Sequence, residues 1–512
     1  MNIDTFFAHH GIGENPFSAE EARLDPVYGR LLDSEPAHPD FGKILGRIEQ
    51  PSTSIVFGEK GSGKTAIRLM MAKQIDEHNR RNPEQKVLTV VYDDLNPVLD
   101  NLLRRSHHNA QTMLERLRIE DHQDAILSLA VTQLVSGLLG QTGPDAALMP
   151  NDLNKRIRKS MGRQNRVNLL VLAALYDQPD AGAVLPRWKN LKKTLRLGSA
   201  VPQNLVYYGA VLLTLLGILL VSIAISPPAL IKPEHRPNML LPGLSIAGAA
   251  ILWSTWGWRY LRRLWLGRKI WKATPVVNHR IRELQAMLAQ LSRSDLARQP
   301  FPLPGTGDRN ERDSRYQLTR RLIELLRPLG YVGLVVLVDR LDEPTLVAGH
   351  ADRMKAIVWP MFDNKFLQQD RAGFKMLLPI ELRHMLHRES SSFFQEARLD
   401  KQHLIDRLTW SGPTLHDLCI GRLRACCKSQ ESTLELTDLF EPEVSRDLLI
   451  DALDQMNQPR DAFKFLYAVI QEHCRIVPQG DDRYKIARLT LDSVRRNQAQ
   501  RVQEFHRGLT PA

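Results

Sequence analysis

The sequence has little cysteine, few aromatic residues and no repeated or low-complexity segment. Four cysteines in 512 residues are too few for a disulfide scaffold, so we expect a reducing compartment. A charged fraction of 25% beside 43% hydrophobic residues excludes a long disordered chain, and a mean hydropathy of −0.28 excludes a polytopic transporter. The first residues, MNIDTFFAHHGIG, contain no apolar run, which predicts that no signal peptide is cleaved.

Potential zinc ligands are equally scarce. His416, Cys419, Cys426 and Cys427 fall in one expected helix, where the cysteines alternate with apolar residues. This pattern predicts packing in a hydrophobic core rather than a zinc site.

The net charge is +12 and the isoelectric point is near 9.5. Such an excess of positive charge suits either a nucleic-acid partner or an anionic membrane surface. No helix-turn-helix, zinc finger or base-stacking aromatic pattern is present. Nucleic acid is therefore the less favoured partner.

Two segments without any charge interrupt the otherwise polar chain. Residues 206–226 (VYYGAVLLTLLGILLVSIAIS) and 239–258 (MLLPGLSIAGAAILWSTWGW) are each long enough to cross a bilayer as a helix. Only twelve residues, 227–238, join them. The sequence therefore predicts a transmembrane hairpin, and a buried hairpin of a soluble protein is the alternative.

Basic residues flank this hairpin on the outside. Eleven Lys and Arg residues precede or follow the two segments, whereas the short link contains two. The distribution predicts a two-span protein of the inner (cytoplasmic) membrane with both termini in the cytoplasm. The flanking charges also explain most of the net charge by contact with anionic lipid. Small residues (Gly243 and Ala247, Ala250 and Ser254) could pack the hairpin on itself or form a homo-oligomer.

A phosphate-binding motif lies near the N-terminus. The apolar run 54–57 predicts a strand, the segment GEKGSGKT follows it, and a helical pattern comes next. This is the complete Walker A pattern in its strand–loop–helix context, which predicts that backbone amides surround the phosphates of ATP. Lys64 is expected to reach the β- and γ-phosphates and Thr65 to bind Mg²⁺. The expected nucleotide-binding residues are Gly58, Glu59, Lys60, Gly61, Ser62, Gly63, Lys64 and Thr65.

A second carboxylate motif follows the hairpin. The run 332–338 (VGLVVLV) predicts a strand buried on both faces, and it ends at Asp339. Asp339 is expected to be the Walker B aspartate on the metal side. Asp342 and Glu343 come just after it, and either could activate the attacking water; we favour Asp342.

The order of these elements resembles the KAP group of P-loop NTPases, which is related to the AAA+ and STAND ATPases and carries membrane spans between its Walker motifs. The resemblance covers the element order of most of the chain, with close motif identity only near 54–70 and 332–344. It implies an ATPase acting as a signalling or defence switch. KAP proteins typically read D-D-L-D at the second motif, whereas this chain has Arg340 at the second position. The Glu that AAA+ enzymes place next to the Walker B aspartate is also missing.

The resemblance implies further site residues. A sensor of the γ-phosphate would lie at Glu381 or Arg383, after an expected strand at 374–378. Arg460, at the start of an amphipathic helix, is similar to the lid arginine of AAA+ relatives. The segment 15–17 (NPF) resembles an adenine-contacting segment.

The predicted fold is α/β: a P-loop NTPase core with a mostly parallel sheet, a long helical insertion carrying the hairpin, and a C-terminal helical lid. A further strand is expected at 87–92. The expected parts are the first half of the core (1–100), a helical insertion (101–204), the hairpin (205–260), a helical return with a linker (261–330), the second half of the core (331–397) and the lid (398–512).

These features predict a membrane-anchored ATPase that binds and hydrolyses ATP with Mg²⁺ in the cytoplasm and acts as a conformational switch. The sequence does not identify its protein partner. One alternative is a nucleotide-binding membrane scaffold with little hydrolysis, because Arg340 replaces a carboxylate. Another is a membrane-tethered ATPase that binds nucleic acid, although the chain without its membrane-flanking charges is close to neutral. No GTPase motif of the N/T-K-x-D type is found, which favours ATP.

Overall fold

The computed structural model describes residues 1–18, 21–31, 38–106, 109–140, 161–179, 183–197, 203–226, 240–291, 303–305, 311–428 and 433–506. The chain forms two compact units. Unit 1 comprises Met1–Pro97, Ala110–Leu117 and Gly330–Ala512, and unit 2 comprises Val98–Asn109 and Arg118–Leu329. The link between the two apolar segments (227–238), most of the expected linker 299–310 and the expected loop 141–151 lie outside the described residues.

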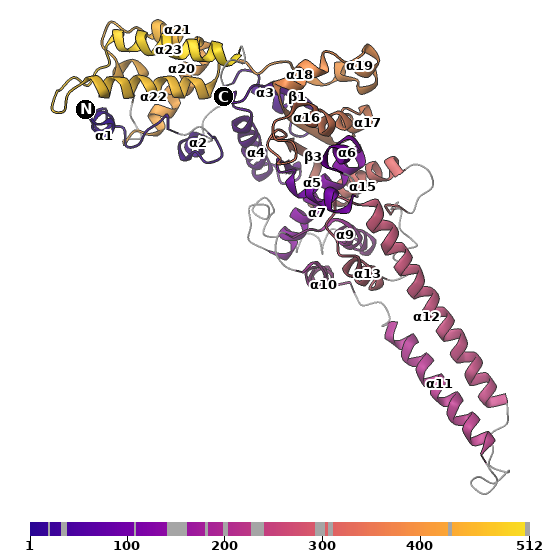
Figure 1. The fold of residues 1–512 in the computed structure, drawn as a ribbon. Coiled ribbons are helices and arrows are strands. Elements are labelled where there is room, and N and C mark those ends of the chain that lie inside the picture. The colour runs from indigo at the N-terminus through magenta and orange to yellow at the C-terminus, as the bar shows by residue number, and fades with distance from the viewer. Residues whose placement is uncertain are drawn as a thin grey trace. The chain divides into compact units, whose positions relative to one another are not determined.

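Unit 1 contains a five-stranded sheet in the order β2-β3-β4-β1-β5, and every pair of neighbours is parallel. Figure 1 labels β1 and β3 of this sheet. The strands are β1 (Ser54–Gly58), β2 (Lys86–Tyr92), β3 (Tyr331–Val338), β4 (Ala372–Pro379) and β5 (His403–Ile405). The predicted strands at 54–57, 87–92, 332–338 and 374–378 are confirmed. Their almost continuous burial explains why each is a run of apolar residues rather than an alternating pattern.

The prediction for residues beyond 398 was wrong at one place. We expected only helices there, but His403–Ile405 forms β5 and pairs with Ser54–Val56 of β1. The strand has three residues, and His403 at its start is exposed. Such a short, partly polar segment has no periodicity from which a strand could be predicted.

Helices pack on the sheet. Apolar residues of α3 and α4, including Ile44, Ile67 and Met71, pack on Val56 and Leu337 of the sheet. The helices of this part of unit 1 are α3 (Phe41–Leu45), α4 (Lys64–Arg81), α6 (Ala110–Glu115), α16 (Ala351–Val358), η4 (Trp359–Met361), α17 (Asn364–Leu367), α18 (Ile380–Leu386), α19 (Ser391–Ala397) and η5 (Leu399–Lys401). The first two helices of the chain, α1 (Ile3–His9) and α2 (Pro26–Leu31), pack instead with the C-terminal helices.

The C-terminal part of unit 1 is helical and has its own core. Cys419, Cys426 and Cys474 are buried in that core together with Phe6 and Phe7 of α1, which confirms core packing for Cys419 and Cys426. The prediction was wrong for Cys427, which follows the end of α20 and is only half-buried. His416 is also buried. The elements are α20 (Gly412–Ala425), η6 (Leu436–Leu439), α21 (Arg446–Asp454), α22 (Pro459–Ile476) and α23 (Arg488–His506).

Unit 2 is helical throughout its described residues. The chain enters it through α5 (Asn96–Arg105), and Arg105 donates hydrogen bonds to the carbonyls of Trp271, Thr274 and Val277 at the end of α12. The other elements are α7 (Ile119–Leu139), α9 (Arg163–Tyr176), α10 (Val184–Thr194), α11 (Gln203–Ile225), α12 (Leu240–Ala273), α13 (Ile281–Ala289), α15 (Glu311–Leu326) and η3 (Arg327–Leu329).

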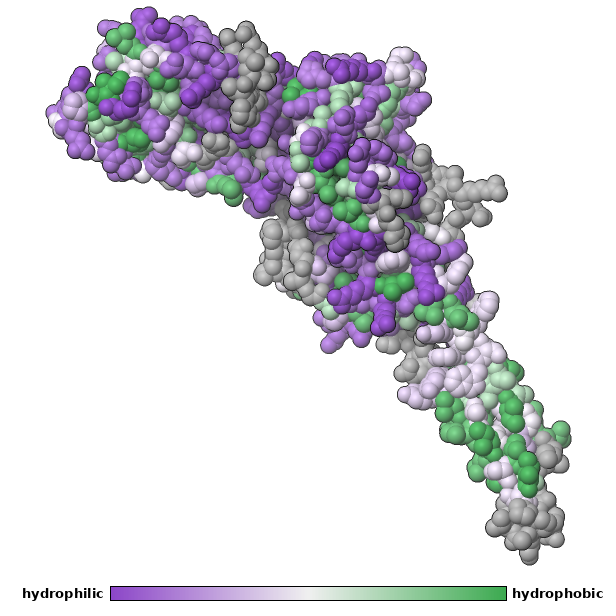
Figure 2. Space-filling view, viewed as in Figure 1, coloured by the Kyte–Doolittle hydropathy of each residue, from purple (hydrophilic) through white to green (hydrophobic). Residues whose placement is uncertain are grey.

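Two helices of unit 2, α11 and α12, are long and apolar enough to cross a membrane. They pack against each other as a hairpin, and Figure 2 shows a largely apolar surface over both. Ser245 and Ala249 of α12 are buried, and a Cβ at Gly217 of α11 would meet Ser245 at 3.0 Å. The predicted small residues 243, 247, 250 and 254 are all exposed instead. The hairpin therefore packs through a different face of α12 from the one that we singled out.

Candidate functional site

The loop from Gly58 to Thr65 connects the end of β1 to the start of α4. Gly61 and Gly63 have φ angles of +96° and +90°, which side-chain-bearing residues rarely adopt. Gly63 is the N-cap of α4 and provides no capping side chain. The first amides of this 18-residue helix therefore have no side-chain acceptor, and such a helix start favours an anion.

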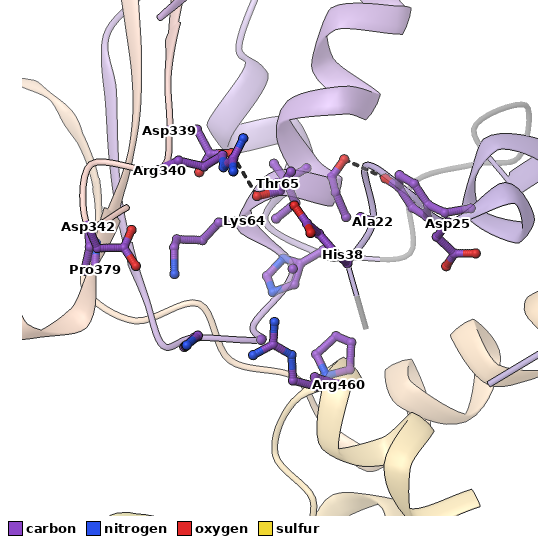
Figure 3. Close-up of a pocket in the computed structure, with 18 of the residues that line it drawn as sticks. Ala22, Asp25, His38, Lys64, Thr65, Asp339, Arg340, Asp342, Pro379 and Arg460 are labelled. Atoms are coloured by element: carbon purple, nitrogen blue, oxygen red, sulfur yellow. Dashed lines mark hydrogen bonds between the residues drawn. The ribbon is translucent and has the colours of Figure 1, made fainter. Parts of the chain in front are cut away.

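Lys64 lies within this loop. Its ammonium donates hydrogen bonds of 2.8 Å to the carbonyls of both Gly58 and Glu59. Burial lowers the pKa of Lys64, and the carboxylates of Asp342, Asp339 and Glu381 oppose that shift, in that order. Three acidic groups from two segments, the end of β3 and the start of α18, therefore act on one lysine. Figure 3 shows the Asp342 carboxylate and the Lys64 side chain on facing sides of the cavity.

Asp339, at the end of β3, is buried beside the first turn of α4. The Thr65 hydroxyl donates a hydrogen bond of 2.9 Å to its Oδ2 atom (Figure 3), and Arg68 Nε lies 3.2 Å from the same oxygen. Burial raises the pKa of Asp339, and the charge of Arg68 is the largest opposing influence. The predicted residues Thr65 and Asp339 are thus brought into contact across 274 positions of sequence.

The loop after Asp339 places the two candidate water-activating residues differently. Arg340 has a left-handed backbone (φ +58°) and forms an ion pair with Glu343. Asp342 forms no ion pair with the described residues of this loop; its backbone carbonyl accepts a hydrogen bond from Gly349 N–H at 3.0 Å, and its side chain lines the cavity. Glu343 is therefore paired with Arg340, whereas the Asp342 side chain is directed toward Lys64.

The two candidate sensor residues, Glu381 and Arg383, differ in whether they line the cavity. Both lie on α18, which begins immediately after β4. Glu381 lines the cavity, whereas Arg383 is not among the lining residues and lies 3.9 Å from Asp406. Since β4 lies between β1 and β3, the carboxyl ends of three adjacent strands bring Gly58, Glu381 and Asp339 to one edge of the sheet.

The C-terminal helices contact the loop directly. Arg460, in the first turn of α22, donates its backbone N–H to Gly61 at 3.4 Å, and its guanidinium points into the cavity (Figure 3). Gln458 donates to the Glu59 carboxylate, and Trp410 Nε1 donates to the Ser62 carbonyl at 2.8 Å. These contacts hold the loop from the side opposite to the sheet.

The loop and these helices enclose a cavity of about 790 Å³, within the size range of small-molecule sites. Away from Lys64 its wall contains a buried ion pair, in which Arg422 Nη1 donates to Asp25 at 2.6 Å. Phe463 lines the same wall and lies 4.5 Å below the Arg422 guanidinium. Trp410 and His38 make an edge-to-face contact at 4.8 Å.

The segment 15–17 is not among the lining residues. It lies behind the wall: the Pro16 carbonyl accepts from Arg422 Nε at 2.7 Å, and the Phe17 ring stacks on Phe463 at 6.2 Å. Its influence on a ligand would therefore pass through Arg422 and Phe463.

Sequence reasoning missed several residues of the site. Arg68 could have been found, because it follows Lys64 by four positions and therefore lies on the same face of α4. Trp410, Arg422 and Phe463 carry no local signal, since their place in the cavity depends on how the C-terminal helices pack.

Thr65 and Asp339 fit Mg²⁺. Both offer hard oxygen donors, the kind of ligand that Mg²⁺ prefers, and their oxygens lie 2.9 Å apart, so these two residues could hold the ion together. Because the hydroxyl proton is donated to Asp339, the Thr65 oxygen keeps its lone pairs for a cation.

Comparisons of the chain with protein-family models, curated proteins and solved structures give no match. Any functional proposal therefore depends on the residues and the geometry of this chain.

Proposed function

We propose that the protein is a membrane-anchored P-loop ATPase that binds ATP with Mg²⁺ at the loop 58–65 and hydrolyses it. One observation carries the proposal. The ends of three adjacent parallel strands bring Lys64, the Thr65–Asp339 pair and Glu381 around one cavity, and Arg460 enters it from the helical part. A triphosphate is the ligand whose charge suits this set: amides, a lysine and an arginine on one side, and metal-binding oxygens on the other.

The residues have separable tasks in this proposal. The ammonium of Lys64, now bonded to two loop carbonyls, would turn to the phosphates and neutralise them together with Arg460. Mg²⁺ would supply charge stabilisation on the phosphate oxygens from the side of Thr65 and Asp339. Asp342 would orient the attacking water and accept its proton, because Glu343 is already paired with Arg340.

The helices α11 and α12 anchor the protein in a membrane in this proposal, with unit 1 and the rest of unit 2 on the cytoplasmic side. The aromatic residues Tyr207, Trp253 and Trp256 are grouped at one end of the hairpin, with ring centroids 5.6–5.8 Å apart, as is typical of a membrane interface. Beyond them α12 continues with six basic residues and no acidic one up to Ala273. Binding and release of the phosphates would change the position of α22 on the loop, which makes the protein a conformational switch.

A nucleotide-binding scaffold without hydrolysis is the second candidate. The ion pair between Arg340 and Glu343 favours it, because that pair removes one of the two carboxylates available for water activation. The scaffold predicts tight ATP binding with no phosphate release.

Phosphate release and nucleotide binding by the detergent-purified full chain test these candidates. We expect Lys64→Ala to abolish both, and Asp342→Asn to lower release at least about 100-fold while binding persists. Lys428→Ala and Asp370→Asn, which change exposed residues far from the loop in sequence, are matched controls. Binding without release in the parent protein would leave the scaffold as the function, and absence of both would reject the nucleotide site.

A further inference from the structure

Arg68 is a buried cation shared by two carboxylates. Its side chain is 5% exposed; Nε lies 3.2 Å from Asp339 Oδ2, and Nη2 lies 3.2 Å from Asp93 Oδ2. Asp339 ends β3 and Asp93 follows β2, the neighbouring strand. One guanidinium on α4 thus connects the ends of two strands of the sheet.

The contact with Asp339 uses the oxygen that also accepts from Thr65. A divalent cation bound by Asp339 and Thr65 would therefore lie about 4–5 Å from the Arg68 guanidinium, because both would contact the same oxygen. Two positive charges at that separation repel each other by several kcal/mol in a partly buried site. Arg68 and the cation consequently compete for the same carboxylate.

Asp93 gives the guanidinium another partner. A buried charge that loses its only counter-ion is strongly destabilised. Arg68 already contacts Asp93, whose side chain is 22% exposed, so it can move away from Asp339 without becoming unpaired. The two carboxylates differ in their position relative to the cavity. Asp339 lines it at the loop 58–65, whereas Asp93 is not among the residues that line it.

We propose that Arg68 is a positioning residue that acts as an internal counter-ion. It neutralises Asp339 while no Mg²⁺-nucleotide is bound, and it moves toward Asp93 when the metal arrives. The exchange keeps a buried aspartate from being an unpaired charge and sets the concentration of Mg²⁺ at which nucleotide binds tightly. This inference rests on the proposed function, since it requires a Mg²⁺-nucleotide at the loop 58–65.

Two substitutions test the proposal because they shift the same quantity in opposite directions. The quantity is the Mg²⁺ concentration that gives half-maximal binding of a fluorescent ATP analogue to the detergent-purified full chain, measured at equilibrium without turnover. We expect Arg68→Met to lower it about tenfold by removing the competitor. We expect Asp93→Asn to raise it about threefold to tenfold, because Arg68 then has only Asp339 as a charged partner.

The double variant and a metal-free measurement complete the experiment. Arg68→Met with Asp93→Asn should behave like Arg68→Met alone, whereas a further shift in the double variant would assign the effect of Asp93 to Arg340, on which its charge also acts, and overturn the role of Arg68. Affinity for the analogue in EDTA should match the parent in every variant, which separates competition from damage to the fold. If Arg68→Met does not fold, Asp93→Asn and the smaller change Arg68→Gln still give opposite shifts.

The failures of the two proposals are distinguishable. Shifts in the same direction, or no shift in a parent that binds nucleotide with Mg²⁺, overturn the role of Arg68 and leave the proposed function standing. A parent that binds no nucleotide with or without Mg²⁺ overturns both.

Discussion

At the scale of a single residue, Lys375 shows how burial within the sheet changes the pKa of a side chain. It lies in the central strand β4, is 1% exposed, and its ammonium has no hydrogen-bond partner within the described part of the chain. Burial lowers the pKa of Lys375 from 10.5 to about 7. Arg68 is buried to a similar degree but has two carboxylates, so the two cations differ in pairing rather than in depth.

Replacing this lysine should stabilise the protein. Between pH 7 and about 10.5 the unfolded chain carries the proton and the folded chain does not, so stability rises with pH; below pH 7 both carry it and the full penalty remains. We expect Lys375→Met to raise the free energy of unfolding at pH 7 by about 2–4 kcal/mol. We also expect the stability of this variant to lose its increase between pH 7 and about 10.5.

Thermal unfolding of the detergent-solubilised variants at pH 6, 7.5 and 9 measures the effect. Lys401→Met, at an exposed lysine, is the control and should change the unfolding temperature little at any of these pH values. An unchanged pH profile in Lys375→Met would contradict the assigned burial of an unpaired ammonium.

At the scale of elements, the contact between the loop 58–65 and α22 is the feature that completes the site. A Cβ placed on Gly61 would lie 2.9 Å from Arg460 Cβ and 3.1 Å from Gln458 Oε1. Pro459 in the first turn of α22 also lies 3.9 Å from such an atom on Gly63. Glycine is therefore needed here for space as well as for its φ angle.

We expect Gly61→Ala to weaken nucleotide binding at least about tenfold, because α22 must move away from the loop and take Arg460 with it. Gly480→Ala is a matched control: Gly480 has a φ of +87°, but an added Cβ meets nothing within 4 Å. Both changes should cost about 1–2 kcal/mol of stability through backbone strain. Equal nucleotide affinities in the two variants would show that the contact with α22 does not matter for binding.

At the scale of the whole molecule, the two units differ in what they expose. Unit 1 contains the sheet and the cavity, whereas unit 2 contains α11 and α12, whose apolar windows are only 11% and 17% buried. So much exposed apolar surface is favourable in lipid and not in water. In the proposed topology, the basic residues outside the hairpin would keep both termini in the cytoplasm.

Labelling of single cysteines in spheroplasts tests that orientation. In a background where the four native cysteines are replaced by alanine, Ala229→Cys in the short link should react with an impermeant maleimide added outside. Leu489→Cys, at a side chain that is 82% exposed in unit 1, should react only after the membrane is permeabilised. Reaction of Leu489→Cys in intact spheroplasts would reverse the proposed topology.

The four longer strands could be predicted because strands buried on both faces are runs of apolar residues, as in Tyr331–Val338. The start of the helix at Pro459 could also be predicted, since proline is favourable in the first turn of a helix. β5 could not be predicted, because its three residues gain their place from pairing with β1. The packing face of α12 also escaped prediction, because several of its faces carry small residues and only contact with α11 selects one.

The sequence by itself determined the local elements: the glycine loop with its lysine and threonine, the apolar strands, the carboxylate after β3 and the two charge-free segments of the hairpin. These depend on interactions within a few residues of each other. The tertiary structure decided which distant residues meet, such as Thr65 with Asp339, Arg68 with Asp93, and Gly61 with Arg460. The physical reason is that the order of parallel strands aligns their carboxyl ends at one edge, and no local pattern encodes that order.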